Sequence, residues 1–353
     1  MIRFAWTRFR TQAAVGAGVL AIAAIALLVT RIQLTHAYDA AAAACKQHGN
    51  CAGLFNAFLN QGYFTAGKLL EAAGLAVPGL IGMFWGAPLV ARELETGTFR
   101  LAWTQGVTRT RWLAAKLAIA GAAAIAAGEL FTLMVNWWSG PIHKANAGYT
   151  AFTSGSFHSG VAPAGYAAFA FALGVTAGLL IRRTLPAMAV TLAVFAAVII
   201  AFPLWVRPHL IPPARTTSAL SLASVAVTGG TSDGHLILTT NTATGRPGAW
   251  VISSQVTTPD GRAASGEPAG PCGISSAQAC NDYIESLHFR QTVTYQPASR
   301  YWAFQWIETA IYLTLALALA GFSFRWINRN RSTELNIRRP RTRQPAPALQ
   351  SSP

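Results

Sequence analysis

The sequence predicts an all-α polytopic membrane protein with six transmembrane helices and a small mixed α/β extracytoplasmic domain between helices 5 and 6. Three observations support this fold class. First, 52% of the 353 residues are hydrophobic and only 11% are charged, whereas soluble domains contain about 25% charged residues. Second, six apolar runs are long enough to cross a hydrocarbon layer about 30 Å thick, which takes about 20 helical residues. Third, the basic residues cluster at the ends of these runs, as in membrane proteins.

The net charge of +15 has two interpretations. Lys and Arg neutralise the phosphates of nucleic acids, but here they form short clusters beside apolar runs. That placement favours a role in orienting membrane spans. We therefore expect membrane lipid as a partner and no nucleic acid.

The first apolar run raises the question of cleavage. It follows Arg3, Arg8 and Arg10, so a signal peptide is the alternative to a first span. Its apolar core is long for a signal peptide, and the following Thr35-His36-Ala37 is a poor cleavage site. An uncleaved span is therefore favoured. The six predicted spans lie near residues 12–30, 70–91, 113–138, 163–181, 184–206 and 302–324.

The distribution of basic residues predicts the topology. Among the short loops, Arg and Lys concentrate in the segments that become cytoplasmic if the N-terminus is inside. Both termini are therefore predicted on the cytoplasmic side of the plasma membrane. The predicted domains are residues 1–206 with spans one to five and a cytoplasmic coupling loop at 92–112, an extracytoplasmic domain at 207–300, a sixth span at 301–325, and a basic, disordered cytoplasmic tail at 326–353.

All four cysteines fall in segments predicted outside. Disulfides persist in oxidising compartments and are rare in the cytosol, so the local pairs Cys45–Cys51 and Cys272–Cys280 are expected. A metal site of four thiolates is the alternative, although zinc sites usually have closer cysteine spacing. The outer domain should contain strands near 236–240 and 249–256 and a helix near 275–289. A domain of roughly 90 residues builds only a marginal core, which explains a disulfide there.

Two features inside the spans are ambiguous. Glu129 is the only ionisable residue well inside a predicted span, and such residues mark functional sites by default. A protonated carboxyl group that bonds across a helix interface is the alternative. Two glycine pairs with a spacing of four, Gly82/Gly86 and Gly174/Gly178, indicate close helix packing or arise by chance among 31 glycines.

Two sequence patterns imitate enzyme motifs. The segment 62–68 matches a phosphate-binding loop through its lysine, but Leu69 replaces the magnesium-binding Ser or Thr and no strand precedes it. The segment 154–160 places serines near His158 without a nucleophile elbow or an orienting acid. We therefore predict no catalytic, metal or cofactor-binding residues in this chain.

The chain resembles the permease subunits of ABC-2 type exporters. The resemblance is carried by the segment GAPLVARELETGTFRLAWTQGVTRTRWLAAK (86–116), the six-span pattern, the short hairpin between spans four and five, and YQPASRYWAFQWIE (295–308) before the last span. The resemblance implies that Glu93, Glu95, Thr98 and Arg100 belong to a coupling helix seated on a separate ATP-binding subunit. It also implies that ATP and Mg bind in that subunit, and that the permease forms a homodimer or a heterodimer with a similar chain. The outer domain is larger than in the plainest members of that family.

The predicted function is therefore that of a non-enzymatic permease subunit that exports an amphipathic, drug-like or lipid-like substrate. One alternative is a standalone proton-coupled secondary transporter that uses Glu129, although such folds usually show internal repeats that this sequence lacks. The other is a membrane sensor with an extracytoplasmic ligand domain. The tail after Arg325 contains no folded effector domain, which counts against the sensor.

Overall fold

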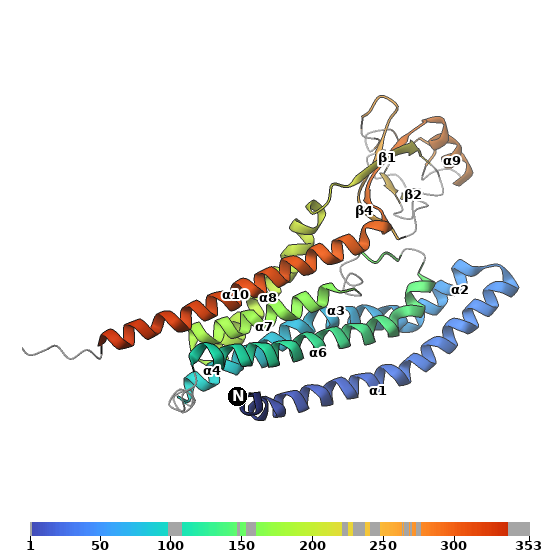
Figure 1. The fold of residues 1–353 in the computed structure, drawn as a ribbon. Coiled ribbons are helices and arrows are strands. Elements are labelled where there is room, and N and C mark those ends of the chain that lie inside the picture. Colours follow the sequence, from blue (N-terminus) through green and yellow to red (C-terminus); the bar gives the residue numbers. More distant parts are fainter. Residues whose placement is uncertain are drawn as a thin grey trace, which may run out of the picture.

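The protein is a bundle of long helices with a small sheet domain at one end (Figure 1). The computed structural model describes residues 2–97, 108–146, 149–152, 160–220, 225–228, 237–240, 248–262, 264, 268, 270–272 and 277–337. The helices of the bundle are α1 (Ile2–His48), α2 (Cys51–Phe58), α3 (Phe64–Ile81), α4 (Ala87–Glu95), α6 (Arg109–Ala145), α7 (Ala162–Ile181), α8 (Thr184–Ala201) and α10 (Tyr301–Ile337).

Six stretches of the described chain are long and apolar enough to cross a membrane, as predicted. They are Arg10–His48, Cys51–Glu95, Thr110–Ala145, Ala162–Ile181, Thr184–His209 and Ala298–Arg329. Several extend beyond the predicted apolar runs, because hydropathy identifies only the part of a helix that lies in an apolar layer. Short π-helical turns at Gly82–Gly86 and Phe202–Val206 join successive helices into continuous spans. The turn at Leu59–Tyr63 instead contains a kink at Gly62, which has a positive φ of 92°.

The segment between the first two predicted spans is helical. α1 continues through the alanine-rich stretch before Cys45, and α2 starts after Gly49, which has a positive φ of 72°. The Asn50 side chain accepts a hydrogen bond from the backbone N–H of Gly53 and so caps α2. Cys45 and Cys51 are joined as a disulfide across this turn.

α7 lies at the centre of the bundle. It contacts α3, α4, α6, α8 and α10, and 78% of its most apolar window is buried, against 6% for α1. A helix that is apolar on every side needs such a central position. α7 therefore connects the elements of the bundle to one another, whereas α1 lies at the perimeter.

The glycine pairs lie where the second and fourth spans cross. A Cβ atom at Gly82 would lie 2.4 Å from the carbonyl oxygen of Ala170, and one at Gly86 would lie 2.6 Å from that of Phe171. From the other side, a Cβ atom at Gly174 would lie 2.3 Å from the carbonyl oxygen of Gly82. The two backbones touch here, so close packing is the correct interpretation of both pairs.

The sheet domain, formed within residues 214–296, contains a three-stranded antiparallel sheet in the order β1-β5-β4 and a separate β2–β3 pair. Its elements are β1 (Ala214–Ala219), β2 (Val225–Thr228), β3 (Ile237–Thr240), β4 (Trp250–Thr257), α9 (Ala277–Ser286) and β5 (Arg290–Gln296). β3, β4 and α9 lie close to the predicted segments. Cys272 and Cys280 are joined as a disulfide and are buried with Ile284 and Phe289 in the domain core.

The first part of the predicted tail is helical in the structure. The sixth span was predicted to end at 325 and to be followed by a disordered tail, but α10 continues to Ile337. The sequence from 326 to 337 contains neither glycine nor proline, so nothing in it ends the helix. The remainder of the predicted tail, residues 338–353, lies outside the described residues.

Replacing both Cys272 and Cys280 with serine is expected to destabilise the sheet domain by about 2.5 kcal/mol, because the unfolded chain regains the entropy that closure of a short loop removes. Limited proteolysis of membranes would measure this as faster cleavage between residues 214 and 296. The matched control is the replacement of Cys45 and Cys51, whose disulfide lies in the α1–α2 turn and should leave that cleavage unchanged. Equal cleavage rates in the two double variants would contradict the prediction.

Candidate functional site

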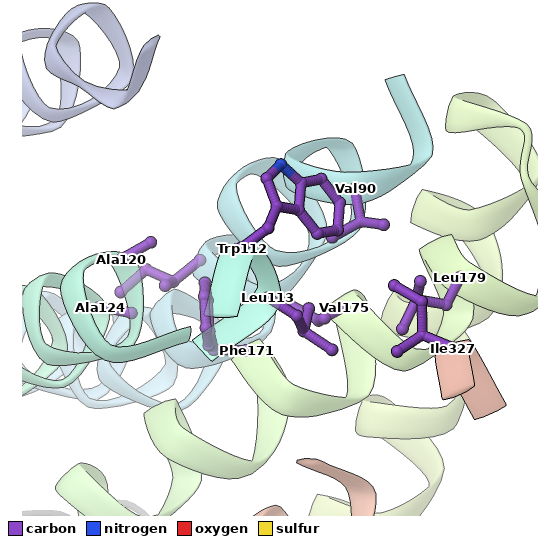
Figure 2. Close-up of a cluster of buried hydrophobic side chains, with 10 residues drawn as sticks. Val90, Trp112, Leu113, Ala120, Ala124, Phe171, Val175, Leu179 and Ile327 are labelled. Carbon is purple, nitrogen blue, oxygen red and sulfur yellow. The ribbon is translucent and has the colours of Figure 1, made fainter. Parts of the chain in front are cut away.

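The α4 end of the bundle lies opposite the sheet domain (Figure 1). It carries a group of exposed arginines. We call it the arginine-rich end and define it by Arg92 at the end of α4, Arg111 at the start of α6, and Arg182 and Arg183 in the α7–α8 turn. Beneath it, buried side chains from four helices meet in one cluster (Figure 2). They include Val90 from α4, Trp112 and Leu113 from α6, Leu179 from α7 and Ile327 from α10. The four helix ends are thus held together by a common apolar core.

The elements at this end have clear local boundaries. α4 ends at Glu95, and Gly97 leaves the helix with a positive φ of 71°, a conformation that glycine adopts without steric cost. α6 begins after Thr108, whose hydroxyl oxygen accepts a hydrogen bond of 3.3 Å from the Arg111 N–H. Two predicted site residues, Thr98 and Arg100, belong to the segment between these helices and lie outside the described residues.

Glu93 fastens α4 to α6. Its Oε1 atom lies 2.6 Å from the Lys116 Nζ atom, and the same ammonium group donates to the Leu89 carbonyl oxygen over 3.0 Å. Lys116 also lies 4.3 Å from the centre of the Trp112 ring. The Lys116 side chain is only 6% exposed and that of Glu93 is 19% exposed. The Glu93 carboxylate and the Leu89 carbonyl group compensate the buried ammonium group of Lys116. Because both belong to α4 and Lys116 belongs to α6, these contacts hold the two helices together.

Glu95 fastens α4 to α8. Its Oε2 atom accepts hydrogen bonds from the Thr184 N–H (3.0 Å) and from the Thr184 hydroxyl group (2.7 Å). A carboxylate at this position satisfies an otherwise unpaired N–H of the first helical turn and interacts favourably with the helix dipole. The end of α4 therefore has one attachment to α6 and another to α8.

The two attachments follow from the helix geometry. Residues two positions apart on an α-helix are rotated by roughly 200°, so Glu93 and Glu95 leave α4 on nearly opposite sides. In the structure both carboxylates bind groups of this chain. Their partners Lys116 and Thr184 are distant in sequence and no sequence motif identifies them.

Glu129 lies apart from the arginine-rich end, beside the start of α7. It lies beside the backbone of Ala164, in the first turn of α7. Its Oε2 atom is buried and has no hydrogen-bond partner within the described residues. The structure thus places Glu129 against a neighbouring helix and leaves one carboxylate oxygen unsatisfied.

A buried charged cluster at the sheet end was not predicted. The Arg207 Nε and Nη2 atoms each donate to Glu308 over 3.0 Å, and the Tyr166 hydroxyl group donates to the same carboxylate. Arg207 is 2% exposed and Glu308 is 0% exposed. These residues come from the end of the fifth span, from α10 and from α7. The sequence did contain one signal for this cluster: Arg207 and Glu308 each lie at the end of an apolar run. Because charges within membranes normally occur in pairs, the two residues could have been proposed as partners.

A protein-family model described as ABC-2 membrane transporter related matches residues 17–207. This range contains α2 through α8, the arginine-rich end, and most of α1. No curated protein and no solved structure matches the chain.

Proposed function

Because the matched model covers more than half of its length, the chain belongs to the ABC-2 membrane transporter related family, and from this premise we propose that it is the permease subunit of an ATP-driven exporter. The family assignment and the six apolar helices identify a multi-pass membrane protein of a transporter family. Permeases of the ABC-2 type in general associate with an ATP-binding subunit. In this proposal that subunit supplies ATP and Mg, and this chain is not itself an enzyme.

The observation that carries the proposal is the double attachment of α4 at the arginine-rich end. Force from ATP hydrolysis can move membrane helices only through a segment fixed to them. Glu93 joins the end of α4 to α6, and Glu95 joins it to α8. A subunit that pushed on this end, including the segment with Thr98 and Arg100, would therefore move several spans together.

The proposed orientation places the arginine-rich end in the cytoplasm and the sheet domain outside the plasma membrane. The excess of arginine at one end supports it through the positive-inside rule. The two disulfides lie in the α1–α2 turn and the sheet domain, which both fall outside in this orientation, where disulfides persist. A homodimer or a heterodimer with a similar permease completes the transporter.

We propose an amphipathic, drug-like or lipid-like substrate. Two acidic groups of the spans at the sheet end are bound within the chain, Glu308 by Arg207 and Glu71 by Lys68 over 2.9 Å. The span surfaces are rich in exposed apolar side chains, such as Val19, Ile22 and Leu185. Such surfaces suit an apolar substrate better than a hydrated ion.

A second candidate is a proton-coupled secondary transporter. The observation in its favour is the unsatisfied Oε2 atom of Glu129, which could bind a proton. Transport in membrane vesicles separates the two candidates. An exporter needs ATP and its activity survives Glu129→Gln, whereas a proton-coupled carrier runs on a pH gradient and loses its activity in that variant.

Replacing Glu93 and Glu95 together with glutamine is expected to leave the protein in the membrane but to lower its stimulation of the ATP-binding subunit about fivefold, at the low end of typical coupling between sites. Glutamine keeps the side-chain size but removes the charge that faces Lys116 and the start of α8. The measurement is the ATPase rate of the purified complex. Glu285→Gln, an exposed change in the sheet domain, is the control, and an ATPase rate equal to the control would contradict the coupling role.

A further inference from the structure

We infer that the arginine-rich end binds an acidic surface of the ATP-binding subunit, with Arg182 at the centre of the contact. This inference rests on the proposed function and names the chemistry of the partner's surface. It adds Arg92, Arg111, Arg182 and Arg183 to the residues that the resemblance assigns to the coupling helix.

The first support is the distribution of charge. Among the described side chains at this end, the acidic ones are Glu93 and Glu95, and Lys116 and Thr184 already occupy them. The arginines Arg92, Arg111, Arg182 and Arg183 are exposed. The charge offered to a partner is therefore positive, and guanidinium groups bind carboxylates with paired hydrogen bonds.

The second support is the rigidity of the arginine-bearing backbone. Arg92 lies two residues after Val90, which is 0% exposed, and Arg111 is adjacent to Trp112, which is 4% exposed. Both of these apolar side chains belong to the cluster shown in Figure 2. Charges carried on anchored helix ends lose little backbone entropy on binding, so they suit a contact that must transmit force.

The third support is the conformation of Arg182. It ends α7 with φ 57° and ψ 15°, and its N–H donates to the Gly178 carbonyl oxygen over 3.1 Å. Where a helix ends in this left-handed conformation, the residue is usually glycine, because a Cβ atom is unfavourable there. The chain thus places a long cationic side chain where its own backbone would favour glycine. This placement indicates that the Arg182 side chain has a binding role.

The position of Arg182 favours a protein partner over lipid headgroups. Arg182 follows α7, the helix that the other spans surround. Its backbone therefore lies at the end of the most buried span, and not on a helix of the perimeter. By contrast, Arg10 lies on α1, which packs mainly on α6 and α2, and it is exposed. Arg10 therefore serves as the control for Arg182, because it is an exposed arginine near the same end of the bundle but on a perimeter helix.

The test is recovery of the ATP-binding subunit with the tagged full-length permease after solubilisation in detergent. Arg182→Glu is expected to lower recovery at least tenfold, and the wild-type complex should dissociate as salt screens the contact. Arg10→Glu should recover as much as the wild type. Arg182→Gly removes the charge and relaxes the backbone, so it should also lower recovery while the thermal unfolding midpoint stays the same or rises.

The outcomes separate the two levels of the proposal. If the wild-type chain recovers no ATP-binding subunit, the proposed function fails and this inference fails with it. If the wild type recovers it and both Arg182 variants do so equally well, the inference alone is overturned. The third outcome concerns lipid and uses the Arg182→Glu variant reconstituted into bilayers. If this variant loses the ATP-binding subunit in bilayers that contain phosphatidylglycerol but keeps it in pure phosphatidylcholine, the arginines bind lipid headgroups. That result would overturn the inference.

Discussion

Gly174→Ala is expected to destabilise the membrane bundle by about 3 kcal/mol, at the upper end of the cost of overpacking. A Cβ atom at this position would lie 2.3 Å from the Gly82 carbonyl oxygen and 2.7 Å from the Ala87 backbone nitrogen. Both neighbours are backbone atoms, which cannot rotate aside as a side chain can. The second and fourth spans would therefore have to separate along their whole crossing.

Thermal unfolding of the purified protein in detergent, followed by size-exclusion chromatography, measures this effect. Gly321→Ala is the matched control, because it makes the same change in α10 at a site where, among the described residues, no atom beyond its own helix backbone and chain neighbours lies within 4 Å of the new Cβ. That variant should unfold at or above the wild-type temperature, since alanine favours helix over glycine. If Gly174→Ala and Gly321→Ala unfolded at the same temperature, the spans would not be in backbone contact.

Arg207→Ala is expected to cost about 3–5 kcal/mol, the range observed when one partner of a buried ion pair is removed. The change leaves the Glu308 carboxylate, which is 0% exposed, without its two guanidinium bonds. Tyr166 alone cannot compensate a negative charge at this depth. Glu308→Ala should be similarly costly, because it leaves the guanidinium group unpaired.

A double variant distinguishes loss of the pair from loss of packing. Changing both Arg207 and Glu308 to methionine keeps an apolar volume and removes both charges, so it should recover most of the stability that either alanine variant loses. The exposed Arg262–Asp260 pair, with side chains 76% and 73% exposed, is the control. Arg262→Ala should change stability by less than about 1 kcal/mol. If the double variant were less stable than both single variants, the charged pair would not be the source of the effect.

The spans could be predicted because lipid imposes a simple requirement. A backbone inside a bilayer must satisfy its own hydrogen bonds, so about 20 apolar residues in a row indicate a helix. The extension of α1 to His48 and of α10 to Ile337 was missed because helices that leave the apolar layer carry no hydropathy signal. Residues 31–48 and 326–337 read as polar segments in the sequence, and only local helix propensity indicated their structure.

The candidate site was predictable in its location but not in its contacts. The basic residues around 92–116 identify the loop, yet the pairing of Glu93 with Lys116 and of Glu95 with Thr184 depends on how α4, α6 and α8 pack. Likewise, the pairing of Arg207 with Glu308 links residues about a hundred positions apart. Long-range contacts of this kind leave no periodic pattern in a single sequence.

α10 is one uninterrupted helix of 37 residues, about 55 Å long at 1.5 Å per residue. It carries Glu308 in the buried cluster at the sheet end and Ile327 in the apolar cluster beneath the arginines. A stiff rod of this length acts as a lever: a tilt of about 5° shifts one end by roughly 5 Å relative to the other. A partner that held the sheet domain could therefore shift the opposite end of the bundle without any helix having to bend.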